Sequence, residues 1–468
     1  MSRIGKVAKN SMILGLQHVV ANLLSVFVVG YIARKLGKVD YGVFSFAFTF
    51  TVIFSFIGDF GLRTLTIREV AKEREHSSEY LSKVIPARLF LIALMTAVSP
   101  LAAIILHYDA KIVGIVAIAA LAAMFEQLSR IINDIFQAHE EMGKVAFRDI
   151  SVRVFSGLVS IAVLYYGYGL VAVGWVYVIG TIMGLAINII LYNKRFQWPK
   201  IQIDYAFIWK NIQEGLSFMI LGMASTMYAS IDVFIISKLL NMESVGVYNA
   251  SASLFYRLNI IADAVATASF PAIAQLYWQE KQVADNVLTK SLCGIFVISI
   301  PTAVGGYILS GDIIAMIYGG DYEGSSIVFQ ILIVSLPLMF LSIQLNYALG
   351  AIRLQNKLLK FMLTLLFIKI IANFILVSIF GLVGSALATF STELIGFCFL
   401  IYFSKIYFEF VGLLKSLTIV IIPLLAMIAT VLYVKKFGPI IAIGSGVVSY
   451  CVTLFLCGGK KYILILRK

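Results

Sequence analysis

Five basic residues lie inside long apolar runs of the sequence: Arg88, Arg130, Arg153, Arg257 and Lys369. At the centre of a membrane helix such a charge costs about 2.5–3.5 kcal/mol unless it is paired or reaches water. A guanidinium group can hold phosphate oxygens through two parallel hydrogen bonds, and an ammonium group attracts them as a point charge. The five cations are therefore candidates for binding the phosphate oxygens of an anionic ligand in a hydrated interior cavity.

Ion pairs inside the protein are the alternative for two of these cations. Glu126, Arg130 and Asp134 are spaced by four residues, so they share one face of a helix and can pair along it. Lys369 and Glu393 fall near the middle of successive apolar runs and can pair across a helix interface. The sequence leaves both interpretations open for Arg130 and favours the ion pair for Lys369.

The other three cations have less obvious partners. Arg257 has no acid four residues away, and Asp263 is six residues further on, so the sequence favours ligand binding for Arg257. Arg88 and Arg153 lie near the predicted inner ends of their runs, where a long side chain can extend to the lipid headgroups instead. Both interpretations stay open for these two arginines.

Acidic residues and one histidine in the apolar runs are candidates for coupling or gating. Protonation or cation binding at a buried acid can favour one conformation of a membrane protein over another. A helix cap or a pair with Arg63 is the alternative for Asp59, and a hydrogen-bonded polar cluster is the alternative for His18. The candidates are Asp59, Asp232, Asp263, Glu393 and His18.

The composition determines which elements can hold these residues. Of the 468 residues, 61% are hydrophobic and 13% are charged, and the mean hydropathy is +0.96. Soluble domains have about 45–50% apolar and about 25% charged residues. The chain is therefore an integral membrane protein, and its continuous apolar runs favour helices over the alternating pattern of a β-barrel.

The apolar runs predict an all-α protein with fourteen transmembrane helices, since one helix needs about 20 residues to span the hydrocarbon core. Most Lys and Arg fall in alternate connections, which predicts that both termini are cytoplasmic in a multi-pass protein of the plasma or inner membrane. The predicted spans are 11–31, 41–62, 84–107, 112–136, 150–166, 170–191, 216–240, 245–271, 292–309, 327–349, 358–379, 382–403, 417–433 and 440–457.

Several function classes are excluded or disfavoured by what the sequence lacks. The net charge of +13 follows the membrane topology, so it does not indicate nucleic-acid binding. The sequence contains no HExxH, GxSxG or Walker A motif, so we expect no enzymatic activity and no ATP-driven step within this chain. The four cysteines lie in apolar runs without CxxC spacing, which predicts small core residues and no metal site.

Short motifs recur in order along the two halves of the chain and indicate an internal repeat of six spans. Lys35-Leu36 followed by GVF at 42–44 recurs as Lys238-Leu239 followed by GVY at 246–248. An even number of spans per repeat gives both copies the same orientation in the membrane, which is a common plan among transporters. We predict an N-lobe at 1–191, an interfacial linker at 192–213, a C-lobe at 214–403 and a C-terminal helix pair at 404–468.

The motifs of both halves resemble those of polysaccharide and lipid-linked oligosaccharide flippases of the multidrug/oligosaccharidyl-lipid/polysaccharide superfamily. In the first half these are ARKLG at 33–37, DYGVF at 40–44, DFGL at 59–62 and REVA at 68–71. In the second half they are GVYNA at 246–250, IYGGDY at 317–322 and FGLVGSA at 380–386.

The resemblance implies movement of an isoprenoid-diphosphate-linked glycan from the inner to the outer leaflet by alternating access of two six-helix lobes. We expect no cofactor. Transport would be coupled to a proton, sodium or membrane-potential gradient, and the partners would be membrane lipids and glycan-assembly enzymes. A multidrug antiporter of the same superfamily is the first alternative. A membrane-embedded glycan polymerase or glycosyltransferase is the second, although its catalytic loop would need longer connections than these.

Overall fold

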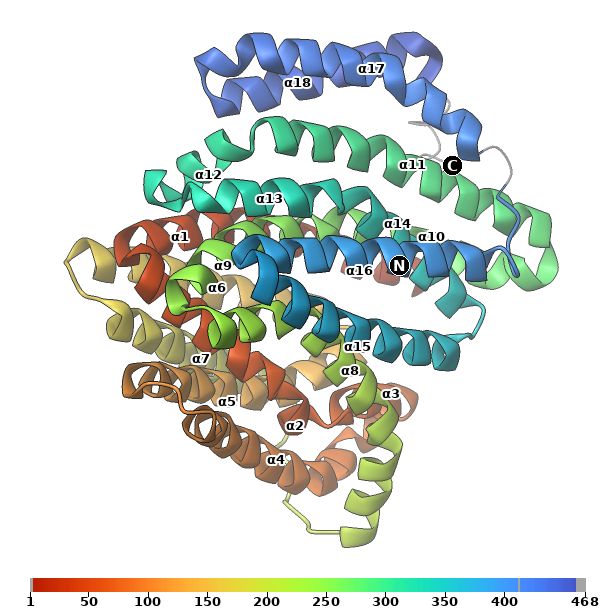
Figure 1. The fold of residues 1–468 in the computed structure, drawn as a ribbon. Coiled ribbons are helices and arrows are strands. Elements are labelled where there is room, and N and C mark those ends of the chain that lie inside the picture. Colours follow the sequence, from red (N-terminus) through yellow and green to blue (C-terminus); the bar gives the residue numbers. More distant parts are fainter. Residues whose placement is uncertain (1–2, 411–412, 460–468) are drawn as a thin grey trace. The chain divides into compact units, whose positions relative to one another are not determined.

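The computed structural model describes the backbone of residues 3–410 and 413–459, and the side chains of residues 25–75, 77–410 and 418–457. Helices form every regular element in this part of the chain, and no strand occurs in it. In lipid each backbone polar group must be satisfied within its own segment, which long helices achieve. The all-α prediction is confirmed (Figure 1).

The chain forms two compact units, Met1–Gly246 and Val247–Lys468. Helix α9 (Met242–Arg257) begins in the first unit and ends in the second. The other helices of the first unit are α1 (Arg3–Ile53), α2 (Ser55–Asp59), α3 (Leu62–Lys72), α4 (Ser77–Ile105), α5 (Ala110–Ala138), α6 (Met142–Tyr165), α7 (Leu170–Asn193) and α8 (Tyr205–Leu239). Those of the second are α10 (Asn259–Gln279), α11 (Lys281–Ile308), α12 (Ser310–Tyr318), α13 (Gly324–Val334), α14 (Leu336–Ala351), α15 (Gln355–Phe380), α16 (Leu382–Ser404), α17 (Leu413–Val434) and α18 (Pro439–Leu454).

Eleven helices of the described part are long and apolar enough to cross a membrane, or twelve if the bent pair α13–α14 is one span. The number is below fourteen for two reasons. Helix α1 consists of two helices that meet at a kink at Gly37, whose φ of 75° is left-handed; they correspond to the first two predicted spans, but the count includes only Ser25–Asp59, as one span. Helix α6 carries Arg148, Asp149 and Arg153 within its apolar stretch. The fourteen-span topology remains a prediction.

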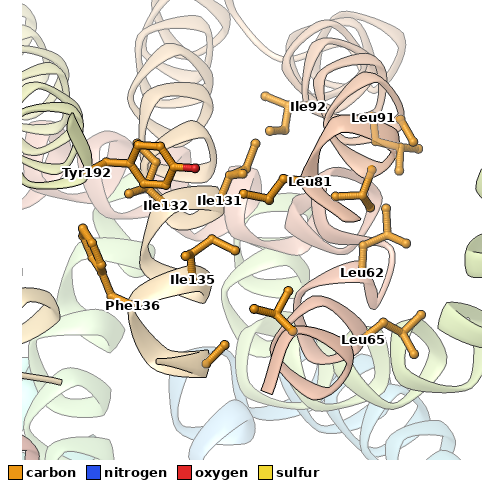
Figure 2. Close-up of a cluster of buried hydrophobic side chains, with 14 of the residues drawn as sticks. Leu62, Leu65, Leu81, Leu91, Ile92, Ile131, Ile132, Ile135, Phe136 and Tyr192 are labelled. Atoms are coloured by element: carbon orange, nitrogen blue, oxygen red, sulfur yellow. The ribbon is translucent and has the colours of Figure 1, made fainter. Parts of the chain in front are cut away.

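The core of the first unit is built around α5, which packs against α4 and α7. Figure 2 shows Ile131, Ile132 and Ile135 of α5 between leucines of α4 and Tyr192 of α7. These side chains belong to one buried cluster that also includes Leu62 and Leu65 of α3. The cluster holds α3 and α4 against α5, and these helices carry several of the candidate charges.

Helix α8 packs along α1, α3 and α4, so the compact first unit extends beyond the predicted linker at 192–213. Residues 194–204 of that linker are not helical, and α8 begins at Tyr205. Trp198 and Trp209 are 51% and 62% exposed, as the headgroup layer would require. The boundaries of the N-lobe, linker, C-lobe and C-terminal helix pair remain a prediction.

In the second unit, α14 packs against α10, α11 and α16, and α15 forms a hairpin with α16. A single residue, Gly381, joins the two helices of the hairpin with a left-handed φ of 58°. Helices α17 and α18 pair with each other and lie on α11 (Figure 1). Tyr450 of α18 donates a hydrogen bond to the Val297 carbonyl of α11 at 2.7 Å.

The prediction that all four cysteines are core residues is wrong for three of them. Cys293 is buried, whereas Cys398, Cys451 and Cys457 are exposed on the outside of their helices. A thiol is apolar enough to face lipid as well as a core, so an apolar run alone does not distinguish the two. No group of three or more metal-ligating side chains occurs among the described residues.

Candidate functional site

Four charged side chains of the first unit form a partly buried network at the α2–α3 turn. Arg88 of α4 donates a hydrogen bond to Asp134 of α5 at 2.6 Å, and its other Nη lies 3.8 Å from an oxygen of Asp59. The Nε of Arg63 lies 3.3 Å from the second oxygen of Asp134. The side chains of Arg88 and Asp134 are 0% exposed, and two cations balance two anions.

This network changes the interpretation of Arg88 and Asp59. Arg88 neither extends to the headgroups nor opens to a ligand, because it is fully buried and held by Asp134. Asp59 is 31% exposed and accepts the backbone N–H of Arg63 at 3.2 Å, which is the predicted cap. Asp134 pairs with Arg88 and Arg63 across helices and not with Arg130 along α5.

We expect Asp134→Asn to destabilise the protein by about 1–3 kcal/mol, because it removes the carboxylate that is hydrogen-bonded to the buried Arg88 and leaves two arginines facing one carboxylate, Asp59. Thermal unfolding of the purified protein in detergent measures the effect. Asp59→Asn is the matched control, since the same chemical change there affects a partly exposed carboxylate at a longer distance. Equal unfolding temperatures for the two variants would contradict a structural role for the buried pair.

A second ionic cluster connects α5 and α6. Glu126 accepts two hydrogen bonds from Arg148, at 2.6 and 3.2 Å, and one from the Nε of Arg130 at 3.2 Å. Arg148 is 3% exposed and also contacts Asp149, whereas the side chain of Arg130 is 43% exposed. Arg148 and Arg130 together balance Glu126 and Asp149, and the partly exposed side chain of Arg130 can still donate hydrogen bonds to a ligand.

The sequence interpretation missed Arg148. It lies directly before the fifth predicted span, in the Phe147-Arg148-Asp149 stretch of a predicted connection. The adjacent acid gave no signal for a helix, because residues at i and i+1 do not face each other on one. Helix α6 begins at Met142 and includes all three residues.

Arg257 lies at the end of α9, where a turn at Leu258 separates it from α10. Its side chain is partly buried, and its Nη1 is fully buried without a hydrogen-bond partner in the described part of the chain. A buried donor without an acceptor costs about 1–3 kcal/mol, and more when it is charged. Such a group is stabilised when a ligand or water supplies the acceptor, which favours the binding interpretation.

Lys369 and Glu393 lie in the hairpin of α15 and α16. Lys369 is 0% and Glu393 7% exposed, and both have interaction partners. Asn373 donates to the Lys369 carbonyl at 3.2 Å and accepts from Ser385 of α16 at 2.8 Å. Lys369 is thus enclosed in a polar helix interface and is not open to a ligand in this conformation.

The remaining candidates are dispersed. Arg153 is exposed on α6 and makes no ion pair with any described residue. Asp232 on α8 is 1% exposed and Asp263 on α10 is exposed, and both have partners. The side chain of His18 lies outside the described residues.

The sequence interpretation also missed two places where helix backbones touch through glycine. A Cβ added at Gly42 of α1 would overlap the carbonyl oxygen of Met242, and one added at Gly246 of α9 would overlap that of Lys38. Met242 and Gly246 occupy in the second repeat the positions of Lys38 and Gly42 in the first. The contact is therefore reciprocal, and a salt bridge of 3.2 Å between Lys38 and Glu243 lies beside it.

A second backbone contact joins Gly61, in the α2–α3 turn, to Gly215 near the start of α8. Arg68 of α3 pairs with Glu214 of α8 at 2.9 Å. Hydrogen bonds to Glu69 and Glu214 raise the pKa of Arg68, so it remains charged. Gly215 and the end of α8 at Leu239 are separated by about 36 Å at 1.5 Å per residue, so the two glycine contacts lie about a bilayer thickness apart.

Polar side chains accompany the first glycine contact at the end of α8. Tyr108, between α4 and α5, shares a hydrogen bond of 2.7 Å with Ser237, and Lys238 lies over its ring at 3.5 Å from the centroid. Burial raises the pKa of Tyr108 to about 12, so its hydroxyl stays protonated. Both ends of α8 therefore make polar contacts within the first unit: Glu214 with Arg68 of α3, and Ser237 and Lys238 with Tyr108.

Residues 7–277 of the chain match the family model described as "Polysaccharide biosynthesis protein". The chain is 23% identical to the "Probable low-salt glycan biosynthesis flippase Agl15" of Haloferax volcanii, over 82% of this chain and 80% of that protein. It is 22% identical to the "Capsular polysaccharide biosynthesis protein CapF" of Staphylococcus aureus, over 82% of this chain and 97% of that protein.

Solved structures show the same fold at low identity. The "Lipid II flippase MurJ, inward closed conformation" superposes with a TM-score of 0.75 at 16% identity, covering 94% of this chain and 97% of that chain. An inward-facing multidrug resistance MATE family transporter of the MOP superfamily gives a TM-score of 0.66 at 13% identity, covering 84% and 98%.

Proposed function

Because the chain belongs to the polysaccharide biosynthesis protein family, we propose that it moves an isoprenoid-diphosphate-linked glycan from the inner to the outer leaflet. The name of the Haloferax volcanii relative, a probable flippase, supports a transporter and not an enzyme. A sugar diphosphate cannot cross about 30 Å of hydrocarbon without polar groups to replace its hydration. The protein supplies such groups on helices whose surfaces are otherwise apolar.

Arg257 is the main candidate for binding the sugar diphosphate head of the substrate, because its buried Nη1 lacks an acceptor among the described residues. Arg130 supports it, since its side chain is 43% exposed and its contact with Glu126 is through Nε. Arg153 is a third, exposed cation. Arg88 and Lys369 would need a change of conformation to take part, because both are 0% exposed.

The same pattern of helix contacts occurs within each unit, which supports the proposed repeat of six spans. In the first unit α5 contacts α1, α4 and α7; in the second, α14 contacts α10, α11 and α16. In the predicted numbering these are the same four spans of each repeat. We therefore retain the two six-helix lobes, the fourteen-span topology and the cytoplasmic termini as parts of the proposal, with the plasma membrane as the location.

The two glycine contacts are proposed to be the closures of an alternating-access cycle. In the predicted topology Gly42–Gly246 lies at the outer end and Gly61–Gly215 at the inner end of the spans. Each joins helices of different repeats, so each must break and re-form as the head enters on one side and leaves on the other. The buried carboxylates Asp232 and Glu393 are the candidates for coupling this motion to a proton, sodium or membrane-potential gradient.

Transport of a fluorescent isoprenoid-diphosphate-sugar between the leaflets of reconstituted vesicles tests the function. We expect the full chain to expose the sugar at the outer leaflet, where a membrane-impermeant reagent can modify it, and empty vesicles to show only slow background exchange. Movement of organic cations without movement of the lipid would contradict the proposal and indicate drug antiport.

A further inference from the structure

An apolar groove of about 370 Å³ lies between the first half of α15 and the second half of α16. Its walls include Phe361 and Leu365 of α15 and Phe399 of α16, and the rings of Phe361 and Phe399 stack with centroids 4.5 Å apart. Lys357 and Lys360 line one end of it. The groove is therefore amphipathic along its length, with two cations at one end and apolar side chains over the rest.

The length of the groove matches one leaflet of a bilayer. From Lys357 to Ile368, the most distant lining residue on α15, the helix rises about 16 Å at 1.5 Å per residue. Half of the hydrocarbon core is about 15 Å. A single acyl chain reaching from the headgroups to the bilayer midplane fits this length.

The two lysines have no carboxylate partner among the described residues. Lys357 donates to the hydroxyl of Tyr407 at 3.0 Å and lies 5.6 Å from the ring centroid of Phe403, and Lys360 is exposed. These contacts orient the ammonium of Lys357 without neutralising its charge. In the predicted topology both lysines lie at the cytoplasmic surface, where anionic lipids attract basic side chains.

We propose that this groove binds an anionic phospholipid of the cytoplasmic leaflet, with its phosphate at Lys357 and Lys360 and one acyl chain between α15 and α16. The groove offers no polar path beyond its charged end, because Thr364 is the only uncharged polar residue that lines it. It is suited to a resident lipid and not to the transit of a glycan head. The site is independent of the proposed transport activity.

Native mass spectrometry of the delipidated full chain tests the site with three added lipids: phosphatidylglycerol, phosphatidylcholine with the same acyl chains, and an isoprenoid monophosphate. We expect at least fivefold stronger binding of phosphatidylglycerol than of phosphatidylcholine. Lys357→Ala combined with Lys360→Ala should remove this preference, and replacement of both lysines by Arg should restore it. Lys281→Ala combined with Lys290→Ala is the matched control, because these lysines are exposed on α11 and are predicted to lie on the same membrane side.

Ile395→Trp tests the apolar part of the groove separately from its charge. Ile395 lines the groove on α16 and is 45% exposed, so a larger side chain fills the groove without disturbing the core. We expect it to lower phosphatidylglycerol binding at least fivefold. Equal binding of the two phospholipids, or equal loss in the control pair, would overturn the proposal. Displacement of phosphatidylglycerol by equimolar isoprenoid phosphate would also overturn it and assign the groove to the transported lipid.

Discussion

Arg257→Ala is expected to lower the rate of lipid-linked sugar flipping at least a hundredfold while the protein remains folded. A hydrogen bond to a charged group contributes about 1.5–3 kcal/mol, and a guanidinium can make two to a diphosphate. Two such bonds correspond to a hundredfold or more, at about 1.4 kcal/mol per factor of ten. Folding should not suffer, because the variant removes a buried donor that has no protein acceptor in the described part of the chain.

The effect is measured as the flipping rate of the fluorescent lipid in vesicles that contain Arg257→Ala or Arg257→Lys. Lys keeps the charge without the two parallel donors, so we expect it to restore part of the rate. Lys290→Ala, an exposed cation on α11 of the same unit, serves as the control for loss of charge alone and should leave the rate unchanged. Normal flipping by Arg257→Ala would remove the observation on which the binding proposal rests.

Gly42→Ala is expected to abolish flipping, although alanine is the better helix former by about 1 kcal/mol. The added methyl group would overlap the Met242 carbonyl oxygen, and neither backbone can yield without separating α1 from α9. Gly246→Ala should have the same effect through the Lys38 carbonyl, since the contact is reciprocal. The closure at the predicted outer end would then not form, and the cycle would stop.

A short bifunctional thiol reagent can report the closure directly. Cysteines placed at Lys38 and Glu243, which are paired at 3.2 Å, should crosslink in a chain whose native cysteines are Ala, and Gly42→Ala should lower the yield. Gly222→Ala on α8 is the matched control, because a Cβ there would meet no atom within 4 Å. If Gly42→Ala crosslinks and flips like the control, the contact is not a closure.

The glycan-flippase family and the helical fold could be predicted from the sequence. The family motifs are local and the apolar runs are long, so neither depends on how the helices pack. The number of spanning helices was harder to predict, since α6 continues through Arg148 and Asp149. Pairing along a single helix was also predictable, as the contact of Arg130 with Glu126 shows.

The sequence by itself determined that charges such as Arg88, Arg257 and Lys369 must lie inside a membrane protein. Only the tertiary structure decided that Arg88 is neutralised by Asp134, that Arg148 and not Asp134 completes the Glu126 cluster, and that Gly42 touches α9. The reason is that a membrane helix is apolar on nearly every side, so its sequence does not reveal which face is turned inward. The rotation of each helix about its own axis is set by packing against helices far away in the chain. It determines which charges find partners and which remain available to a ligand.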